Sequence, residues 1–151
     1  MTIDLLWRGV AVIYASDEPT AKRVATLIKS RGVAAYAFPH FTLDKIWGCF
    51  DAYVFVMAAG GVVRSLCGRL KDKWSDPPVL IVDHNLSTIL PILGHHRGAD
   101  ELADWLASLL GAKVVHTTMS RHLGFSPVEA VERQMLCKLN NADILEIYKT
   151  L

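Results

Sequence analysis

The sequence predicts an α/β fold, a three-layer α/β/α sandwich with a mostly parallel sheet and one antiparallel hairpin. Apolar, β-branched runs alternate with amphipathic segments along most of the 151 residues, a pattern typical of parallel α/β sheets. Several runs are apolar at every position, as expected for strands buried on both faces. A short polar turn joins residues 79–82 to residues 87–93, which favours a hairpin there.

The first half of the chain is expected to contain three strands and two helices. Its strands are residues 9–15, 33–38 and 52–57. The first helix follows the first strand directly, because Ser16 or Asp17 can cap its N-terminus and Gly32 can end it. A second, short helix is expected at residues 42–48.

The second half continues the alternation. A helix is expected from about Gly61, with an apolar stripe formed by Val62, Val63, Leu66 and Leu70. The later elements are a strand at 79–82, its hairpin partner at 87–93, a helix at 98–110 and a strand at 113–117. We divide the chain into a domain at residues 1–118 and a helical tail at residues 119–151 that packs on the same domain.

Composition excludes several classes of function. Apolar residues make up 52% of the chain and charged residues 21%, a globular balance, and a net charge of +1 argues against nucleic-acid binding. Cys49, Cys67 and Cys137 lie far apart, which predicts neither disulfides nor a thiolate zinc site and favours a cytoplasmic protein. The N-terminus lacks the pattern of a signal peptide, and no apolar run is long enough to span a membrane.

The turn at residues 91–103 is the centre of the predicted site. It leads from an apolar strand through Gly94, His95, His96, Arg97 and Gly98 into an amphipathic helix whose first N–H groups can hold an anion or a carbonyl oxygen. Adjacent histidines cannot both bind one metal from a helix face, so we expect no metal. One of them can act as a general acid or base, or both can simply form hydrogen bonds across the turn.

Ligands of parallel sheets bind beyond the carboxyl ends of the strands. Four segments are expected at this edge: residues 16–17, 39–40, 58–64 and, through the hairpin, 94–98. Gly60 and Gly61 allow either close helix-to-strand packing or a ligand-binding backbone. Arg64 can pair with a ligand carboxylate or form a surface salt bridge equally well. Together with Arg69, Lys71 and Lys73 it makes a local basic cluster as expected for an acidic small molecule, although most such clusters are solvated faces. His116, within the last strand, is interpreted as a hydrogen-bonded core residue.

Several separated motifs resemble the N-terminal part of the CbiG family of anaerobic cobalamin biosynthesis. They are Phe55-Val-Met-Ala-Ala-Gly-Gly-Val-Val-Arg64, Lys71-Asp-Lys-Trp-Ser-Asp-Pro77, Val79-Leu-Ile-Val-Asp83, Leu93-Gly-His-His-Arg-Gly-Ala-Asp-Glu-Leu-Ala103 and Leu110-Gly-Ala-Lys-Val-Val-His-Thr-Thr118. The resemblance runs from about Val54 to Thr118. It implies cobalt-precorrin-5A hydrolase activity, the opening of a δ-lactone on a tetrapyrrole with release of acetaldehyde.

The resemblance also implies roles for individual residues. His96 or His95 would be the base, and the family pattern leaves open which of the two histidines it matches. The residues expected to bind the cobalt-precorrin-type substrate are Gly60, Gly61, Arg64, Lys73, Asp76, Gly94, Arg97 and Gly98. No cofactor is implied, since the cobalt belongs to the substrate.

Family members continue into a C-terminal domain beyond the region of resemblance. The predicted function is therefore that of one part of a split hydrolase, whose site is completed by a separately encoded C-terminal domain. A non-catalytic corrinoid-binding or assembly module is the alternative. Neither function involves nucleic acid or a membrane as a partner.

Overall fold

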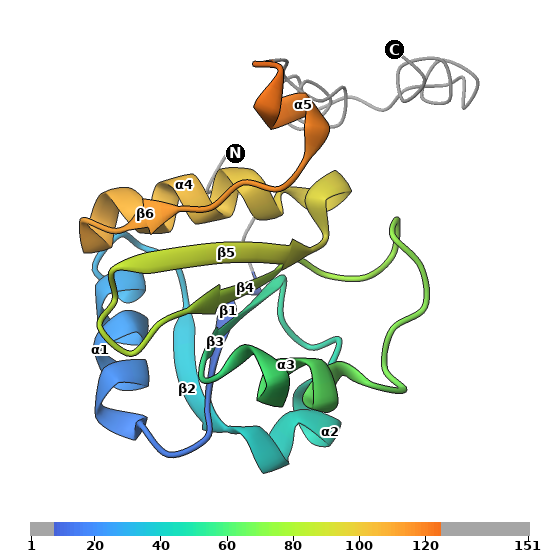
Figure 1. Ribbon diagram of the computed structural model, residues 1–151. Helices are drawn as coiled ribbons and strands as arrows, with labels where there is room; N and C mark the ends of the chain where they lie inside the picture. Colours follow the sequence, from blue (N-terminus) through green and yellow to red (C-terminus); the bar gives the residue numbers. More distant parts are fainter. Residues whose placement is uncertain (1–7, 125–151) are drawn as a thin grey trace.

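A computed structural model describes residues 8–124 of the chain (Figure 1). In this range six strands form one sheet in the order β2-β1-β3-β4-β5-β6. The strands are β1 (Val10–Tyr14), β2 (Ala35–Pro39), β3 (Ala52–Val56), β4 (Val79–Val82), β5 (Thr88–Leu93) and β6 (Lys113–Val114). The helices are α1 (Glu18–Lys29), α2 (Leu43–Ile46), α3 (Ala59–Leu66), α4 (Ala99–Leu110) and α5 (Met119–His122), with 3-10 turns η2 (His40–Thr42) and η3 (His95–Arg97).

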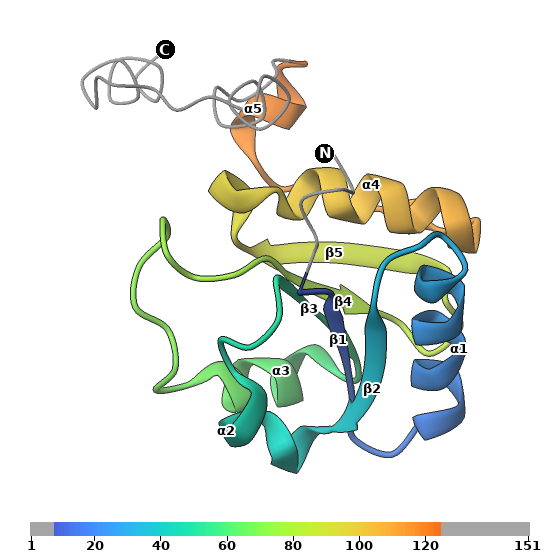
Figure 2. The same ribbon diagram turned by 180° about the vertical axis from the view of Figure 1, so that it is seen from behind.

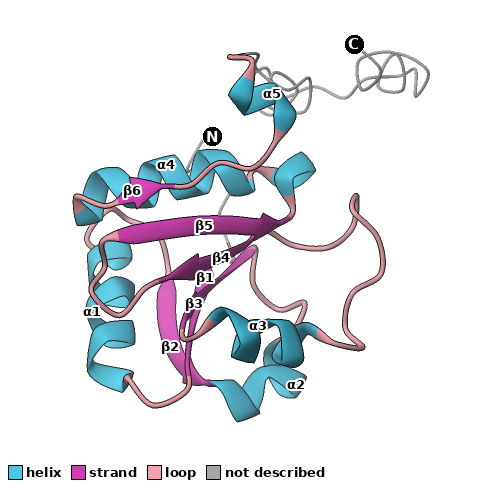
Figure 3. Cartoon of the chain, in the orientation of Figure 1, coloured by secondary structure: helices cyan, strands magenta, loops and turns pink. Residues whose placement is uncertain are grey.

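Helices cover both faces of the sheet, which confirms the predicted three-layer α/β class (Figure 3). On one face α1 and α4 pack against alternate strand residues such as Val12, Val54 and Leu80. On the other face α2 and α3 pack against the residues between them, including Ile13 and Phe55. The two-sided burial explains why these strands are apolar at every position.

Strands β1 to β4 are parallel, whereas β5 is antiparallel to β4 and pairs Leu93 with Val79, the first residue of β4. The end of β5 therefore lies at the amino edge of the sheet, where β1, β3 and β4 begin. The expectation that residues 94–98 join residues 58–64 at the carboxyl edge is wrong, because the hairpin reverses the chain direction. Figure 2 shows α3 and the start of α4 at separate places around the sheet.

The largest differences between the predicted and the observed element boundaries are in α3, α2 and β6. Helix α3 begins at Ala59 and ends at Leu66, so Leu70 lies outside it, and Val63 points to solvent with 64% of its surface exposed. Only the positions one turn apart, Val62 and Leu66, face the sheet. The helix predicted at 42–48 is the single turn α2 preceded by η2, and β6 contains only two residues, so His116 lies beyond it.

Of the helical tail predicted at residues 119–151, the structure describes only residues 119–124, which contain α5, and residues 125–151 lie outside the described residues. Within residues 8–124, no helix is long and apolar enough to cross a membrane.

Gly94 determines how the chain leaves β5. Its φ of 76° lies in the left-handed region, and a Cβ at this position would come within 2.5 Å of the backbone of Pro78. Both the backbone conformation and the close approach require glycine. Gly94 therefore allows the end of β5 to lie close to Pro78, the residue that precedes β4.

Replacing Gly94 with alanine is expected to lower the free energy of unfolding by roughly 2–4 kcal/mol, since left-handed strain adds to a backbone clash. Gly111→Ala is the matched control, because Gly111 has a φ of 69° but no atom within 4 Å of an added Cβ. Strain alone predicts a loss of roughly 1–2 kcal/mol there. Urea denaturation measures both values, and equal losses would contradict the packing role.

Candidate functional site

The three residues of η3 form a turn between two glycines in the left-handed conformation. Gly94 precedes the turn and Gly98, with a φ of 99°, both ends it and precedes the first residue of α4. The amide of Ala99 donates to the carbonyl of Gly94, which closes the loop on itself. His95, His96 and Arg97 are thereby presented together at the amino edge of the sheet.

His95 is held by a carboxylate from the first turn of α4. Its Nδ1 lies 2.9 Å from Oδ2 of Asp100, a residue that is 5% exposed. An ionised carboxylate only accepts hydrogen bonds, so Nδ1 carries the proton and Nε2 is the basic atom. His95 thus has the tautomer and the orientation of a general base backed by an aspartate.

A second histidine contacts the other oxygen of the same carboxylate. Nδ1 of His116 lies 2.8 Å from Oδ1 of Asp100, and Nε2 of His116 lies 2.8 Å from Oδ1 of Asp104, one helical turn further along α4. Arg121 of α5 donates to Oδ2 of Asp104 at 2.7 Å. We call His95, Asp100, His116, Asp104 and Arg121 the histidine–aspartate chain.

The electrostatics of this chain favour an ionised Asp100. Burial raises the pKa of the Asp100 carboxyl. Hydrogen bonds from His95 and His116, together with the electrostatic attraction of both rings, lower this pKa by more than burial raises it, so that the pKa lies below the ordinary value of 3.8. The position in the first turn of a helix also favours a negative charge. Asp100 is therefore a permanent acceptor for both rings at neutral pH.

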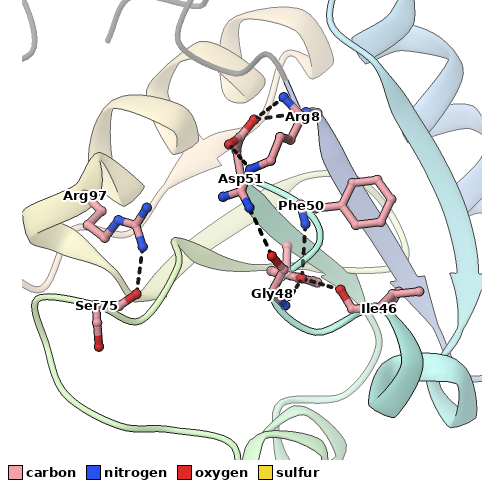
Figure 4. A network of polar contacts seen from close by, with 9 residues as sticks. Arg8, Ile46, Gly48, Phe50, Asp51, Ser75 and Arg97 are labelled. Carbon is pink, nitrogen blue, oxygen red and sulfur yellow. Dashed lines mark hydrogen bonds and ion pairs between the residues drawn. The ribbon is translucent and has the colours of Figure 1, made fainter.

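The loop between α3 and β4 packs against the same turn. The ring of Trp74 stacks on His96 with 4.2 Å between centroids, and Nζ of Lys73 lies 5.1 Å from the Trp74 ring centroid. Arg97 donates to the carbonyl of Ser75 at 2.7 Å, as Figure 4 shows. The turn that carries His95 thus also presents Arg97 and one ring of an aromatic pair, and Lys73 lies near the other ring of that pair.

Asp76, a predicted substrate-binding residue, is buried within this loop. Both of its carboxylate oxygens accept from the amide of Lys71, at 3.0 and 3.1 Å. These contacts give Asp76 a role in shaping the loop.

A further ion pair lies at the amino edge, where β1 and β3 begin. Asp51 accepts from Nε of Arg8 at 3.1 Å and from the amides of Arg8 and Gly9, while Nη1 of Arg8 donates to the carbonyl of Gly48 (Figure 4). Sequence reasoning did not single out this pair, because its members are far apart along the chain.

The other predicted site residues lie away from the histidine turn. Gly60 and Gly61 form the first turn of α3 at the carboxyl edge, and Nη1 of Arg64 lies 3.5 Å from where a Cβ of Gly60 would be. At this edge Asp17 caps α1, and Nδ1 of His84 lies 2.9 Å from its Oδ2. The predicted partnership between Gly60, Gly61 and the turn histidines is corrected by this geometry.

Sequence reasoning missed Asp104, Arg121 and the role of His116. The expectation that the nitrogens of His116 are hydrogen-bonded is confirmed, although the residue is half-buried and lies beyond β6. The sequence feature that could have predicted the histidine–aspartate chain is the four-residue spacing of Asp100 and Asp104, which places both carboxylates on one face of α4.

Asp100→Asn is expected to lower the free energy of unfolding by roughly 1–3 kcal/mol at pH 7, because the asparagine side chain offers one acceptor oxygen to two half-buried imidazole donors. A lowered pKa stabilises the fold above the ordinary value of 3.8, and this contribution is lost as the pH falls through the lower folded value. The difference between wild type and variant should therefore shrink in urea titrations below about pH 3.8. A difference that stays constant from pH 7 to pH 3 would contradict this account.

Asp17→Asn is the matched control. The hydrogen bond to His84 lowers the pKa of Asp17 in the same direction, but this pair is more exposed and asparagine still caps α1. Its effect on the free energy of unfolding should be the smaller of the two.

Comparisons with known proteins identify the family and the fold. The family described as "Cobalamin synthesis G N-terminal" matches residues 41–121. Cobalt-precorrin-5A hydrolase of Salmonella typhimurium is 32% identical over 101 residues, which are 66% of this chain and 29% of that protein. The enzyme of the same name from Priestia megaterium is 34% identical over 79 residues, which are 52% of this chain and 21% of that protein.

The crystal structure of a cobalamin biosynthesis protein G homolog from Sulfolobus solfataricus has the same fold. It aligns with a TM-score of 0.73 and 28% identity over 97% of this chain and 47% of that one. This chain thus spans less than a third of the two curated relatives and about half of the solved one. Because the family match covers more than half of its residues, the chain belongs to the family of the N-terminal part of cobalamin synthesis protein G.

Proposed function

We propose that this chain acts in cobalamin biosynthesis as the N-terminal part of a cobalt-precorrin-5A hydrolase. The observation that carries the proposal is His95, a base oriented by the buried Asp100, in a chain whose curated relatives bear that name. Because the chain spans less than a third of those relatives, the proposed site is completed by the part of them that it does not cover.

The proposed chemistry begins with lactone opening. Nε2 of His95 accepts a proton from water as the water oxygen attacks the lactone carbonyl. The acyl–oxygen bond then breaks as the protonated ring returns this proton to the leaving oxygen, which gives a hydroxyl and a carboxylic acid that ionises to the carboxylate. Loss of the hydroxyl proton turns the C–O bond into a carbonyl and breaks the C–C bond to the macrocycle. Acetaldehyde leaves, and the electron pair of the broken bond stays on the macrocycle until it is protonated.

His95 is a better candidate than His96 for this base. His95 has the carboxylate that sets its tautomer, whereas the ring of His96 is stacked on Trp74. The protein needs no cofactor in this scheme, since the cobalt enters with the substrate. The widely spaced cysteines support a cytoplasmic setting.

The test is acetaldehyde release from cobalt-precorrin-5A by the purified chain, alone and mixed with a C-terminal part of the family. His95→Ala should lower kcat by roughly 10²- to 10⁴-fold, the usual contribution of a general base, while His96→Ala should have a smaller effect. His84→Ala is the matched control, since its ring also contacts an aspartate through Nδ1 but at the opposite edge.

Full activity in His95→Ala would remove the base assignment and leave the family assignment intact. Release by neither the chain nor the mixture would overturn the hydrolase proposal. Binding of the substrate without release would support the second candidate, a non-catalytic corrinoid-binding or assembly module.

Lys73 and Arg97 are proposed to pair with substrate carboxylates, because Arg97 belongs to the turn η3 and Lys73 lies near Trp74, whose ring stacks on the turn residue His96. Lys73→Ala and Arg97→Ala should each raise KM several-fold with little change in kcat. Each substitution should also make KM less dependent on ionic strength. Lys22→Ala is the control, because Lys22 is paired with Glu18 on α1. An unchanged KM in both variants would place substrate binding elsewhere.

A further inference from the structure

His116 lies at the centre of the histidine–aspartate chain without reaching the turn that carries His95. It comes from the segment after β6, whereas both of its acceptors come from α4. Three separate parts of the chain, η3, α4 and the segment from residue 115 to α5, therefore meet at Asp100 and Asp104.

Both ring nitrogens of His116 face carboxylate oxygens at 2.8 Å. Because an ionised carboxylate has no proton to donate, each nitrogen must donate, and the ring that satisfies both contacts is the imidazolium. A cation between two carboxylates allows Asp100 to remain ionised although it is buried. The charge of His116 therefore maintains the acceptor on which His95 depends.

The contact also restricts rotation of the Asp100 carboxylate. One oxygen is held by His116 and the other by His95, and the two bonds run to rings on different segments. Arg121 restrains the Asp104 carboxylate at the other end of the histidine–aspartate chain, because it donates to the Asp104 oxygen that does not contact His116. With His116 removed, Asp100 could turn, and His95 would be free to exchange between its two neutral tautomers.

We infer that His116 is a positioning residue for the proposed hydrolysis: through Asp100 it keeps the proton of His95 on Nδ1 and the basic Nε2 directed outward. The inference rests on the proposed function for its kinetic consequence only. Its structural consequence, a single tautomer of His95, is independent of any substrate. The groups that face His116 are Asp100 and Asp104 from α4, with Arg121 from α5 behind Asp104.

The test uses the full chain labelled with ¹⁵N. Long-range ¹⁵N–¹H correlation spectra report which nitrogen of each histidine ring carries the proton at neutral pH. We expect the wild-type chain to show His95 protonated on Nδ1. His116→Ala should show His95 as a mixture of tautomers, and His116→Asn should restore much of the Nδ1-protonated form, because its amide can donate to Asp100.

The kinetic test uses the chain together with the C-terminal part of the family. His116→Ala should lower kcat about tenfold or more with KM unchanged, and should change the acid limb of the pH profile, because the ring acts through the base. His116→Asn should recover part of this loss. His84→Ala, which removes a comparable ring on the opposite edge, should change neither the His95 spectrum nor kcat.

A His95 tautomer unchanged in His116→Ala would overturn the inference, whatever the activity. If that variant does not fold, His116→Phe keeps the ring and removes both donors, and the same criterion applies. If no preparation releases acetaldehyde but the His95 tautomer changes as expected, the proposed function fails and the positioning of His95 stands.

Discussion

The histidine turn depends on one buried carboxylate. Asp100 stands in the first turn of α4, where the helix dipole favours its charge, and each of its oxygens accepts from a different imidazole. Without those two rings, burial would favour the protonated form of the carboxyl. The contact therefore works in both directions: the rings keep Asp100 ionised, and Asp100 holds the rings in place.

The direction of β5 is the constraint that decides what surrounds this carboxylate. An antiparallel strand returns to the amino edge of the sheet, and Gly94 presses the turn against Pro78 at the start of β4. The loop before β4 then lies next to η3, so that Trp74 stacks on His96 and Ser75 accepts from Arg97. A parallel strand in the same position would have delivered the turn to the carboxyl edge, beside Gly60 and the pair of Asp17 and His84.

Sequence patterns predicted the structure correctly where an element depends only on residues that are neighbours along the chain. The apolar stripe of α4, the fully apolar β3 and the left-handed glycines at the helix ends are properties of neighbouring residues, and the structure agrees with them. The prediction for α3 was less accurate, because the spacing of Val62, Val63, Leu66 and Leu70 does not reveal that Cys67 and Gly68 end the helix. Periodicity identifies an apolar face but not the residue at which packing against the sheet stops.

The sequence alone determined the α/β class, the alternation of elements, the histidine turn and the resemblance to the CbiG family, since each depends on residues close together in the chain. The tertiary structure alone decided which groups meet. The hydrogen bonds from His116 to α4, from Arg121 to Asp104 and from Arg8 to Asp51 join segments separated by 12 to 43 residues. Such contacts leave no periodic trace in a single sequence, because they depend on the sheet order and on the direction of β5.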